Sequence, residues 1–301
     1  MQKLDYLMIS GDIANFSTEN EYIAAAKLLE HITGAFKLDP DCVIIVPGNH
    51  DINWELSKKA YSNIPKSALP PNTPEGKCIP GSIDDEILLR NEDLYRDRFK
   101  NFSEFFYKIH YGVQYPLDYI NQGIIYENED RKILFLGLNS CWEIDHYEPY
   151  RTRASINMDA LAVALDHLLD NKYDHWLKIV IFHHPVLGPE MMKDTGFLQQ
   201  LADHNFQICM SGHIHEPNQD FYKYDERHSI HIIGAGIFGA PKGENKYAPL
   251  QYNLLKLDLD NREIVVETRK KDTPNGSWKA DPRWGDTSKN PDWRYRIQLK
   301  K

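Results

Sequence analysis

The sequence predicts an α/β fold in which two packed β-sheets carry helices on their outer faces. Apolar segments of strand length alternate with helical segments through most of the chain, and a run of strands without helices follows toward the C-terminus. In addition, four of the apolar segments end in Asp, Asn or His. Polar side chains at the carboxyl ends of strands are typical of ligand sites in open α/β sheets, so the same pattern predicts where the site lies.

The N-terminal elements are two strands separated by a helix. The strands are expected at residues 6–10 and 43–46, which are apolar. Residues 18–36 have helical periodicity, with an N-cap at position 17 or 18 and Glu21 completing a capping box. Residues 52–82 contain several prolines and little periodicity, so they are expected to form mostly loop.

The alternation of strands and helices continues along the rest of the chain. Residues 84–110 carry apolar and aromatic residues at helical spacing, which predicts a helix over the sheet edge. The strands expected after it span residues 124–127, 133–138, 179–182 and 208–211. The helices expected among them span residues 159–169 and 197–204. The last strands, which are expected to form a meander, span residues 221–224, 229–233, 252–258 and 264–269.

Length, charge and cysteine usage limit the class of protein. The 301 residues, of which 42% are hydrophobic, are enough for one large domain or for a domain with appendages. The net charge of −9 argues against a dedicated nucleic-acid binder. Three of the four cysteines lie in or beside predicted strands and are expected to be buried thiols. We find no signal peptide and no apolar run of about 20 residues, so the cytoplasm is the expected location and no membrane contact is expected.

Four polar motifs follow four of the predicted strands. They are Gly11-Asp12, Gly48-Asn49-His50-Asp51, His183-His184-Pro185 and Gly212-His213-Ile214-His215. A single Asp in such a place is more often a helix cap, and a single His is more often a structural residue. Together, however, these side chains offer the oxygen and nitrogen donors that first-row divalent metals prefer. The sequence therefore predicts one polar cluster, formed by Asp12, Asn49, His183, His213 and His215.

These motifs, in this order, resemble those of the calcineurin-like metallophosphoesterase superfamily over about residues 5–270. The run Gly-Asp-Ile-Ala-Asn before a helix, the Val-Pro before Gly48 and the His-His-Pro are similar to its cyclic-nucleotide-phosphodiesterase-like branch. The resemblance implies a four-layer αββα sandwich of two mixed β-sheets flanked by helices. It also implies a metal-dependent phosphoesterase that hydrolyses a phosphodiester or a phosphomonoester, with a small nucleotide as the expected substrate.

The resemblance further implies a division of the ligands between two ions. In two-metal phosphoesterases, ions about 4 Å apart clamp the attacking and leaving oxygens. Asp12 would bridge both ions, while Asn49, His183 and His213 would complete one of them. His215 would belong to the other ion. The expected metals are Mn²⁺, Fe²⁺ or Fe³⁺, and Zn²⁺, and the expected nucleophile is a metal-bound hydroxide.

His50 and Asp51 are the expected catalytic pair. By the same resemblance, His50 would protonate the leaving alkoxide or hold a phosphate oxygen, and Asp51 would fix the tautomer of His50. His213 and His215 are two residues apart, which would direct both rings to the same side of an extended segment. His184 is expected to support the site rather than to bind metal.

One motif of the superfamily, an Asp-x-His at the end of the first strand, is absent. Only ten residues precede Gly11-Asp12 in this chain. Asp5 cannot replace the motif, because seven residues of extended chain separate it from Asp12 by about 23 Å. The second ion is left with Asp12 and His215, fewer than the three protein ligands of a typical catalytic zinc site. We therefore expect one tightly bound ion, and two if the missing motif is supplied.

The missing strand also leaves residues 4–10 without a neighbour on one side. Either Met1 is a misplaced start or a truncation, or another chain or terminus covers this edge. A partner domain or a second copy of the chain is therefore expected here or on the tail. As an alternative function, the loss of the motif leaves a catalytically weakened regulatory or binding module. A nuclease of the same superfamily is disfavoured by the net charge.

The predicted metallophosphoesterase domain spans residues 1–270. Two regions, an insertion within it and a tail after it, are expected to set the substrate and the partners. Residues 52–115 leave directly from the Gly48–Asp51 motif and are expected to form an insertion or cap over the site; the alternative is a solvated surface excursion. Residues 271–301 contain eight Lys or Arg, four Asp or Glu and three of the six tryptophans. This basic, aromatic tail is expected to dock on its own domain. The alternatives are docking on a twin or on a neighbouring domain, and stacking on nucleic acid.

A glycine-rich segment, Gly234-Ala-Gly236-Ile-Phe-Gly239, matches the dinucleotide-binding pattern GxGxxG after a predicted strand. That pattern requires a helix next, but Ala240-Pro241-Lys242-Gly243 follows. No nucleotide cofactor is therefore expected.

Overall fold

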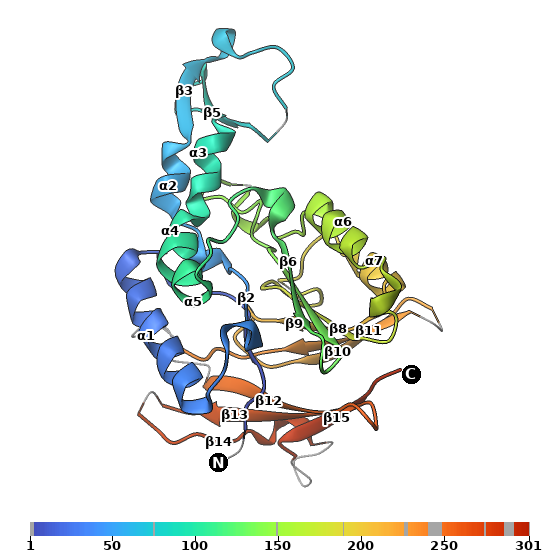
Figure 1. The fold of residues 1–301 in the computed structure, drawn as a ribbon. Coiled ribbons are helices and arrows are strands. Elements are labelled where there is room, and N and C mark those ends of the chain that lie inside the picture. The colour runs from blue at the N-terminus through green and yellow to red at the C-terminus, as the bar shows by residue number, and fades with distance from the viewer. Residues whose placement is uncertain are drawn as a thin grey trace.

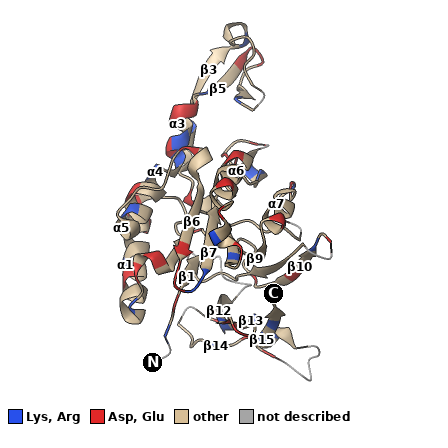
Figure 2. Cartoon of the chain, turned by 45° about the vertical axis from the view of Figure 1, so that its right-hand side comes forward, with Lys and Arg blue, Asp and Glu red and all other residues tan. Residues whose placement is uncertain are grey.

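The computed structural model describes residues 3–74, 76–148, 150–188, 190–225, 228–239, 249–273, 275–285 and 292–300. Figure 1 shows a layered body of sheets and helices from which an arm projects. In Figure 2, blue and red residues are interspersed over the elements in view, and no continuous basic band is visible among the coloured residues. None of the helices in the described ranges is long and apolar enough to cross a membrane.

A six-stranded sheet forms the centre of the body, in the order β10–β11–β9–β8–β7–β6. Its strands are β6 (Gly123–Asn128), β7 (Ile133–Leu138), β8 (Leu177–Ile181), β9 (Phe206–Ser211), β10 (Gln219–Lys223) and β11 (Ser229–Gly234). The four inner strands are parallel, and β6 and β10 are antiparallel at the edges. The meander expected after β9 is therefore wrong for its first two strands. In a meander β10 would lie next to β9, but β11 pairs in parallel with β9, and β10 lies at the edge of the sheet, beyond β11. Strand spacing alone does not reveal this crossover.

The second sheet layer consists of two separate pieces. The first is a parallel pair, β1 (Leu7–Ile9) and β2 (Val43–Ile45). The second contains β12 (Leu250–Asp258), β13 (Glu263–Lys271), β14 (Lys279–Ala280) and β15 (Arg294–Gln298), all antiparallel to their partners. Ile44 and Val46 pack in the core shared with the six-stranded sheet, whereas Val43 and Ile45 face the other way. Successive side chains of β2 point to opposite faces, so the strand contributes both to the core between the sheets and to the core under the outer helices.

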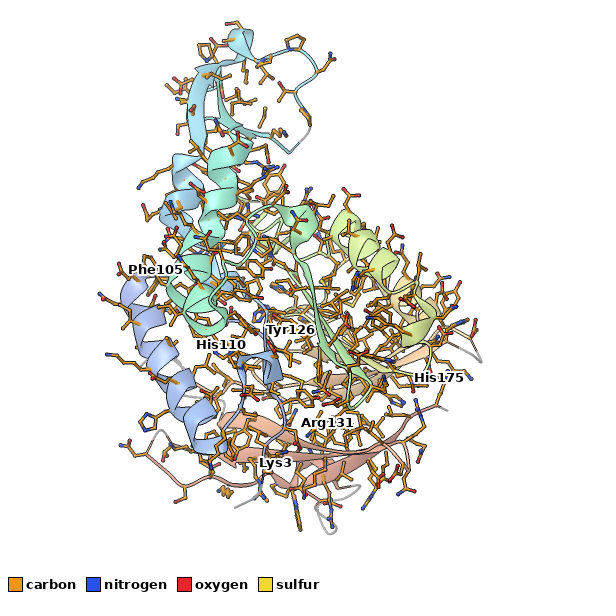
Figure 3. All side chains as sticks on the ribbon, in the orientation of Figure 1. Lys3, Phe105, His110, Tyr126, Arg131 and His175 are labelled. Atoms are coloured by element: carbon orange, nitrogen blue, oxygen red, sulfur yellow. The ribbon has the colours of Figure 1, made fainter. Side chains whose placement is uncertain are left out.

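Helices complete the outer layers. Helix α1 (Glu19–Phe36) packs on the outer face of β1 and β2 together with α4 (Lys100–Phe102), a π-helical turn (Ser103–Tyr107) and α5 (Lys108–Tyr111). Figure 3 labels Phe105 and His110 on this side of the body, beside α1. On the opposite side, α6 (Met158–His167) and α7 (Phe197–Asp203) cover the six-stranded sheet. The order helix, sheet, sheet, helix confirms the predicted αββα sandwich.

The N-terminus of α1 shows why its start was predictable. The carboxylate of Glu21 accepts hydrogen bonds from the backbone N–H and the hydroxyl of Thr18, at 3.0 Å and 2.7 Å. These bonds hold the first turn closed, as the capping-box pattern predicts.

The arm corrects two expectations. Residues 52–82 were expected to be mostly loop, but they contain α2 (Trp54–Lys59), β3 (Tyr61–Pro65) and β4 (Cys78–Pro80). The helix expected from residue 84 begins later, because β5 (Glu86–Arg90) joins β3 and β4 in a small antiparallel sheet before α3 (Glu92–Arg96). Pairing with β5 stabilises both β3 and β4, and the partners in β3 and β5 are more than twenty positions apart, so local periodicity does not report this pairing.

The C-terminal tail packs on its own domain. Strands β14 and β15 both pair with β13, and Ile297 is 1% exposed in the core between the sheets. The indole N–H of Trp284 donates to the hydroxyl of Thr268 at 2.8 Å. The intramolecular docking that was ranked first is confirmed, and it extends the sheet beyond residue 270.

Candidate metal centre

The loops after β1 and β2 touch one another through two glycines. A Cβ atom built on Gly11 would lie 2.5 Å from the backbone nitrogen of Gly48, and one built on Gly48 would lie 2.2 Å from Oδ1 of Asp12. Gly11 also has a φ of +93°, a conformation that side chains disfavour. This close approach allows the N–H of His50 to donate to Asp12 Oδ1 at 2.9 Å.

Four donor atoms from the four strand ends converge beside this contact. His183 Nε2 lies 3.1 Å from Asn49 Oδ1, 3.2 Å from Asp12 Oδ2 and 3.2 Å from His213 Nδ1. The other nitrogen of His183, Nδ1, lies 2.6 Å from the carbonyl oxygen of Ser10 and donates to it. In the neutral ring Nε2 then holds a lone pair aimed at three other electron donors, an arrangement that a cation stabilises. The residues present therefore fit a divalent metal ion.

Burial and mutual charge set the protonation of this cluster. Burial raises the pKa of Asp12, but the charge and hydrogen bond of His183 outweigh it and hold that pKa well below its usual value. For His183, burial lowers the pKa, and the Asp12 carboxylate more than reverses this effect. Burial and the neighbouring charge of His183 lower the pKa of His213 to about 4. An ionised carboxylate and a neutral imidazole are the forms that bind metal, so an ion bound here would take the place of the proton that Asp12 favours on His183.

His213 and His215 do not lie on an extended segment, so that expectation is wrong. Their φ angles are +69° and +56°, and Asp12 has a φ of +55°. Left-handed backbone at non-glycine residues is costly, and strain of this kind is found repeatedly at functional sites. Both histidines still reach one pocket, whose lining residues are Asp12, His50, Leu187, Gly188, Glu190, His213, Ile214, His215, Glu216 and Asn218.

The expected contact between Asp51 and the ring of His50 is replaced by other bonds. His50 Nδ1 pairs with the carbonyl oxygen of Asn15 at 3.0 Å. The carboxylate of Asp51 instead accepts from the backbone N–H groups of Ile13, Ala14 and Gly48, at 2.8–3.3 Å, and from the hydroxyl of Tyr22. Burial, followed by the charge of Asp12, raises the pKa of Asp51 to about 6. Asp51 thus holds the two loops together. The carbonyl oxygen of Asn15, rather than Asp51, is the group that fixes the tautomer of His50.

The described lining of this pocket includes no residue of the segment 52–115. That segment forms the projecting arm and the helices beside α1 (Figure 1), and its role as a cap stays a prediction. In the glycine-rich segment, no helix begins among residues 235–239. Residues 240–243 lie outside the described ranges.

Comparison with known proteins places the chain in a family. A model of the calcineurin-like phosphoesterase family matches residues 1–217, a segment that contains all five predicted ligands. The chain belongs to the calcineurin-like phosphoesterase family. Membership supports, in general terms, hydrolysis of phosphate esters and a requirement for divalent metal ions.

Two similar proteins extend this finding. The chain is 22% identical over 299 residues to the uncharacterized metallophosphoesterase-like protein YydB of Bacillus subtilis (strain 168), covering 97% of this chain and 57% of that protein. It therefore spans little more than half the length of that relative. The fold is similar to that of purple acid phosphatase PPD1 from yellow lupin (Lupinus luteus) seeds, with a TM-score of 0.51 and 11% identity over 98% of this chain and 46% of that one. The second similarity concerns the fold alone.

Some residues of this site were not predicted. The hydroxyl of Ser140 accepts from the backbone N–H groups of His183 and His184, at 3.2 Å and 3.0 Å, and lies 2.9 Å from His184 Nδ1. Ser140 follows β7 at the same edge of the sheet, but the rule that found the other motifs selects Asp, Asn and His, so it would have marked the neighbouring Asn139 instead. Glu190, 3.1 Å from His213, lies in a loop without a motif, and no sequence signal marks it.

Proposed function

We propose that this chain is a metal-dependent phosphoesterase that hydrolyses a phosphodiester or phosphomonoester of a small nucleotide. The observation that carries the proposal is the convergence of Asp12, Asn49 and His213 on His183, whose Nε2 lies 3.1–3.2 Å from a donor atom of each. Membership of the phosphoesterase family supports the reaction class.

The proposed roles follow from which atoms of these side chains are held by hydrogen bonds within the protein. Asp12, Asn49, His183 and His213 would hold one divalent ion, and a bound ion supplies a Lewis acid that activates water and neutralises charge on the phosphate. Their mixed oxygen and nitrogen donors suit Mn²⁺, Fe²⁺ or Zn²⁺. His50 engages Nδ1 with the carbonyl of Asn15, so its Nε2 is the ring atom available to the pocket that His50 lines. As water adds to phosphorus and the ester P–O bond breaks, His50 would pass a proton from Nε2 to the leaving oxygen.

The test compares metal binding and turnover in matched variants. Wild-type protein is expected to bind Mn²⁺ and to hydrolyse bis(p-nitrophenyl) phosphate, and both properties should be lost in His183→Ala. His175→Ala is the control, because Figure 3 labels His175 at the periphery of the body and its side chain is exposed. Turnover by His183→Ala equal to that of the wild type would contradict the proposal.

A second candidate function is a metal-binding regulatory module with little turnover. The observation that favours it is the difference in the number of ligands for the two ions. The first ion would have four protein ligands, whereas the second would share Asp12 with it and have His215, an exposed residue, as its one further ligand. One tightly bound Mn²⁺ per chain without hydrolysis of either diesters or monoesters would support the module. Two ions of similar affinity with turnover would support the enzyme.

A further inference from the structure

His213 uses its two ring nitrogens in opposite directions. Nδ1 lies 3.2 Å from His183 Nε2 and so belongs to the cluster of donor atoms. Nε2 lies 3.1 Å from Oε2 of Glu190, on the other side of the ring. A neutral imidazole carries one proton, and the nitrogen that carries it cannot bind a metal ion. Which nitrogen carries the proton therefore decides whether His213 can act as a ligand.

The carboxylate of Glu190 settles this choice. An ionised carboxylate accepts hydrogen bonds and donates none, so its contact with Nε2 requires the proton to be on Nε2. The lone pair of the neutral ring is then on Nδ1, which lies 3.2 Å from His183 Nε2. We propose that Glu190 is a positioning residue that fixes the tautomer and the ring orientation of His213 so that Nδ1 binds the metal ion. This inference rests on the metal site of the proposed function.

His183 provides an internal comparison. Its outward nitrogen, Nδ1, donates to the carbonyl oxygen of Ser10, which leaves Nε2 as the ligand atom. Both histidines are thus held by a hydrogen bond on the side away from the cluster, as is usual for metal-binding histidines. The two tethers differ in kind, because Ser10 offers a neutral backbone oxygen and Glu190 offers a charged side chain that also makes the ring more basic. Glu190 is 62% exposed, so its tether is in contact with solvent.

A direct role for Glu190 as a metal ligand makes different predictions. Glu190 lines the pocket with Asp12 and His215, so its carboxylate would be a further candidate ligand for an ion that these residues hold. Glu190→Gln separates the two roles. The Gln side chain keeps an oxygen that accepts from Nε2–H, but a neutral amide is a much poorer metal ligand than a carboxylate. A positioning role therefore predicts that Gln replaces Glu well, and a ligand role predicts that Gln fails as Ala does.

Two measurements test the proposal, and neither uses catalysis. Long-range ¹H–¹⁵N NMR of the metal-free protein reports the tautomer of His213, and isothermal titration with Mn²⁺ reports affinity. In the wild type we expect the proton of His213 on Nε2. In Glu190→Ala we expect a mixture of tautomers and a roughly 10–100-fold weaker affinity for Mn²⁺, the range found when such outer partners of metal ligands are removed. Glu190→Gln should keep the tautomer and most of the affinity.

Glu216→Ala controls for charge, because it removes a carboxylate from the same pocket. It should weaken Mn²⁺ binding less than Glu190→Ala does and should leave the tautomer of His213 unchanged. The proposal is overturned if Glu190→Ala keeps both tautomer and affinity, if Glu190→Gln loses as much affinity as Glu190→Ala, or if Glu216→Ala matches Glu190→Ala. A wild type that binds no metal would defeat the proposed function, whereas the tautomer of His213 would still test the hydrogen bond to Glu190.

Discussion

His50 lines the pocket and is the residue that we propose as the proton donor to the leaving group. Its Nδ1 is tied to Asn15, and its backbone N–H is tied to Asp12, so the ring is fixed beside the metal cluster without belonging to it. We predict that His50→Ala lowers kcat for alkyl phosphate esters by about 10²–10⁴-fold, the range typical of general acid catalysis. The loss should be small for p-nitrophenyl esters, whose leaving group needs no proton.

Metal content separates this role from a structural one. His50→Ala should bind as much Mn²⁺ as the wild type, and His31→Ala, an exposed position on α1, should be normal in every assay. An equal loss on both classes of ester would show instead that His50 binds the phosphate group.

The contact between Gly11 and Gly48 gives a second prediction at the scale of single residues. A methyl group on Gly48 would meet Asp12 Oδ1 and the Asp12 backbone at 2.2–2.3 Å. We expect Gly48→Ala to lower the free energy of unfolding by about 1–3 kcal/mol, as overpacking does, and to weaken Mn²⁺ binding because Asp12 must move. Gly34→Ala is the matched control, since a Cβ there meets nothing within 4 Å and α1 should gain up to about 1 kcal/mol. Chemical denaturation and Mn²⁺ titration measure both effects, and similar behaviour of the two variants would contradict this account.

The site residues divide into those that the sequence predicts and those that it does not. Asp12, Asn49, His183 and His213 were predictable because each follows an apolar strand, and parallel strands end at one edge. The partner of His50 was not, because the acceptor is a backbone carbonyl that any residue could supply at position 15. Glu190 was not, because it reaches His213 from a loop.

At the scale of elements, Asp145 ties the arm to the body. It follows β7, and its carboxylate accepts from the hydroxyls of Ser57 on α2 and Tyr61 on β3. It also accepts from the backbone N–H of His146, at 2.6 Å. Burial raises the pKa of Asp145, but the hydrogen bond and charge of the His146 ring, which lies 2.5 Å from Asp145 Oδ1, and the hydroxyls of Tyr61 and Ser57 outweigh it and hold that pKa well below its usual value.

This lowered pKa gives a prediction with a definite sign. Because the pKa is lower in the folded state than in the unfolded state, the Asp145 carboxylate stabilises the fold above the unfolded pKa of about 3.9 and loses this effect as the pH falls through the folded pKa. Asp145→Asn should therefore cost about 1–3 kcal/mol at pH 7. The difference from the wild type should shrink as the pH falls below about 4. Other titrating carboxylates are common to both proteins, so they cancel in the comparison.

Denaturant unfolding at pH 7, 5 and 3.5 makes this measurement. Asp166→Asn, on the exposed face of α6, should differ little from the wild type at every pH. A stability difference for Asp145→Asn that grows between pH 5 and pH 3.5 would have the wrong sign for this mechanism.

The predictability of an element follows from where its stabilising contacts come from. Helices α1, α6 and α7 were predicted to within one or two residues, because their apolar periodicity and caps are local. Strands β3 and β4 were missed, because they are short and their stability comes from pairing with β5. Strand β11 was predicted, but its pairing with β9 was not, because β10 lies between β9 and β11 in the sequence.

At the scale of the whole molecule, the core between the two sheet layers is built from both ends of the chain. Met8 and Ile44 from β1 and β2 pack on the same core cluster as Ile264, Val266 and Ile297 from the C-terminal strands. The end of the chain also reaches the six-stranded sheet, where the backbone N–H of Lys300 donates to Gln207 at 2.7 Å. The sequence predicted that the tail docks, from its tryptophans, but the residues that enter the core are aliphatic. Burial of a single Ile within a polar stretch is not visible in composition.

This arrangement predicts that the tail stabilises the fold through Ile297 rather than through its exposed tryptophan. Ile297 is 1% exposed and pairs with Ile264 of β13, so Ile297→Ala should leave a cavity between the sheets and cost about 2–5 kcal/mol. Trp293→Ala is the matched control in the same segment. Trp293 is 39% exposed, and its carbonyl, which accepts from the N–H of Thr268, is kept by the substitution, so the cost should be about 0.5 kcal/mol. Thermal and denaturant unfolding should show one cooperative transition that shifts for Ile297→Ala alone. A larger loss for Trp293→Ala, or a separate early transition for the tail, would mean that the tail is an appendage and not part of the core.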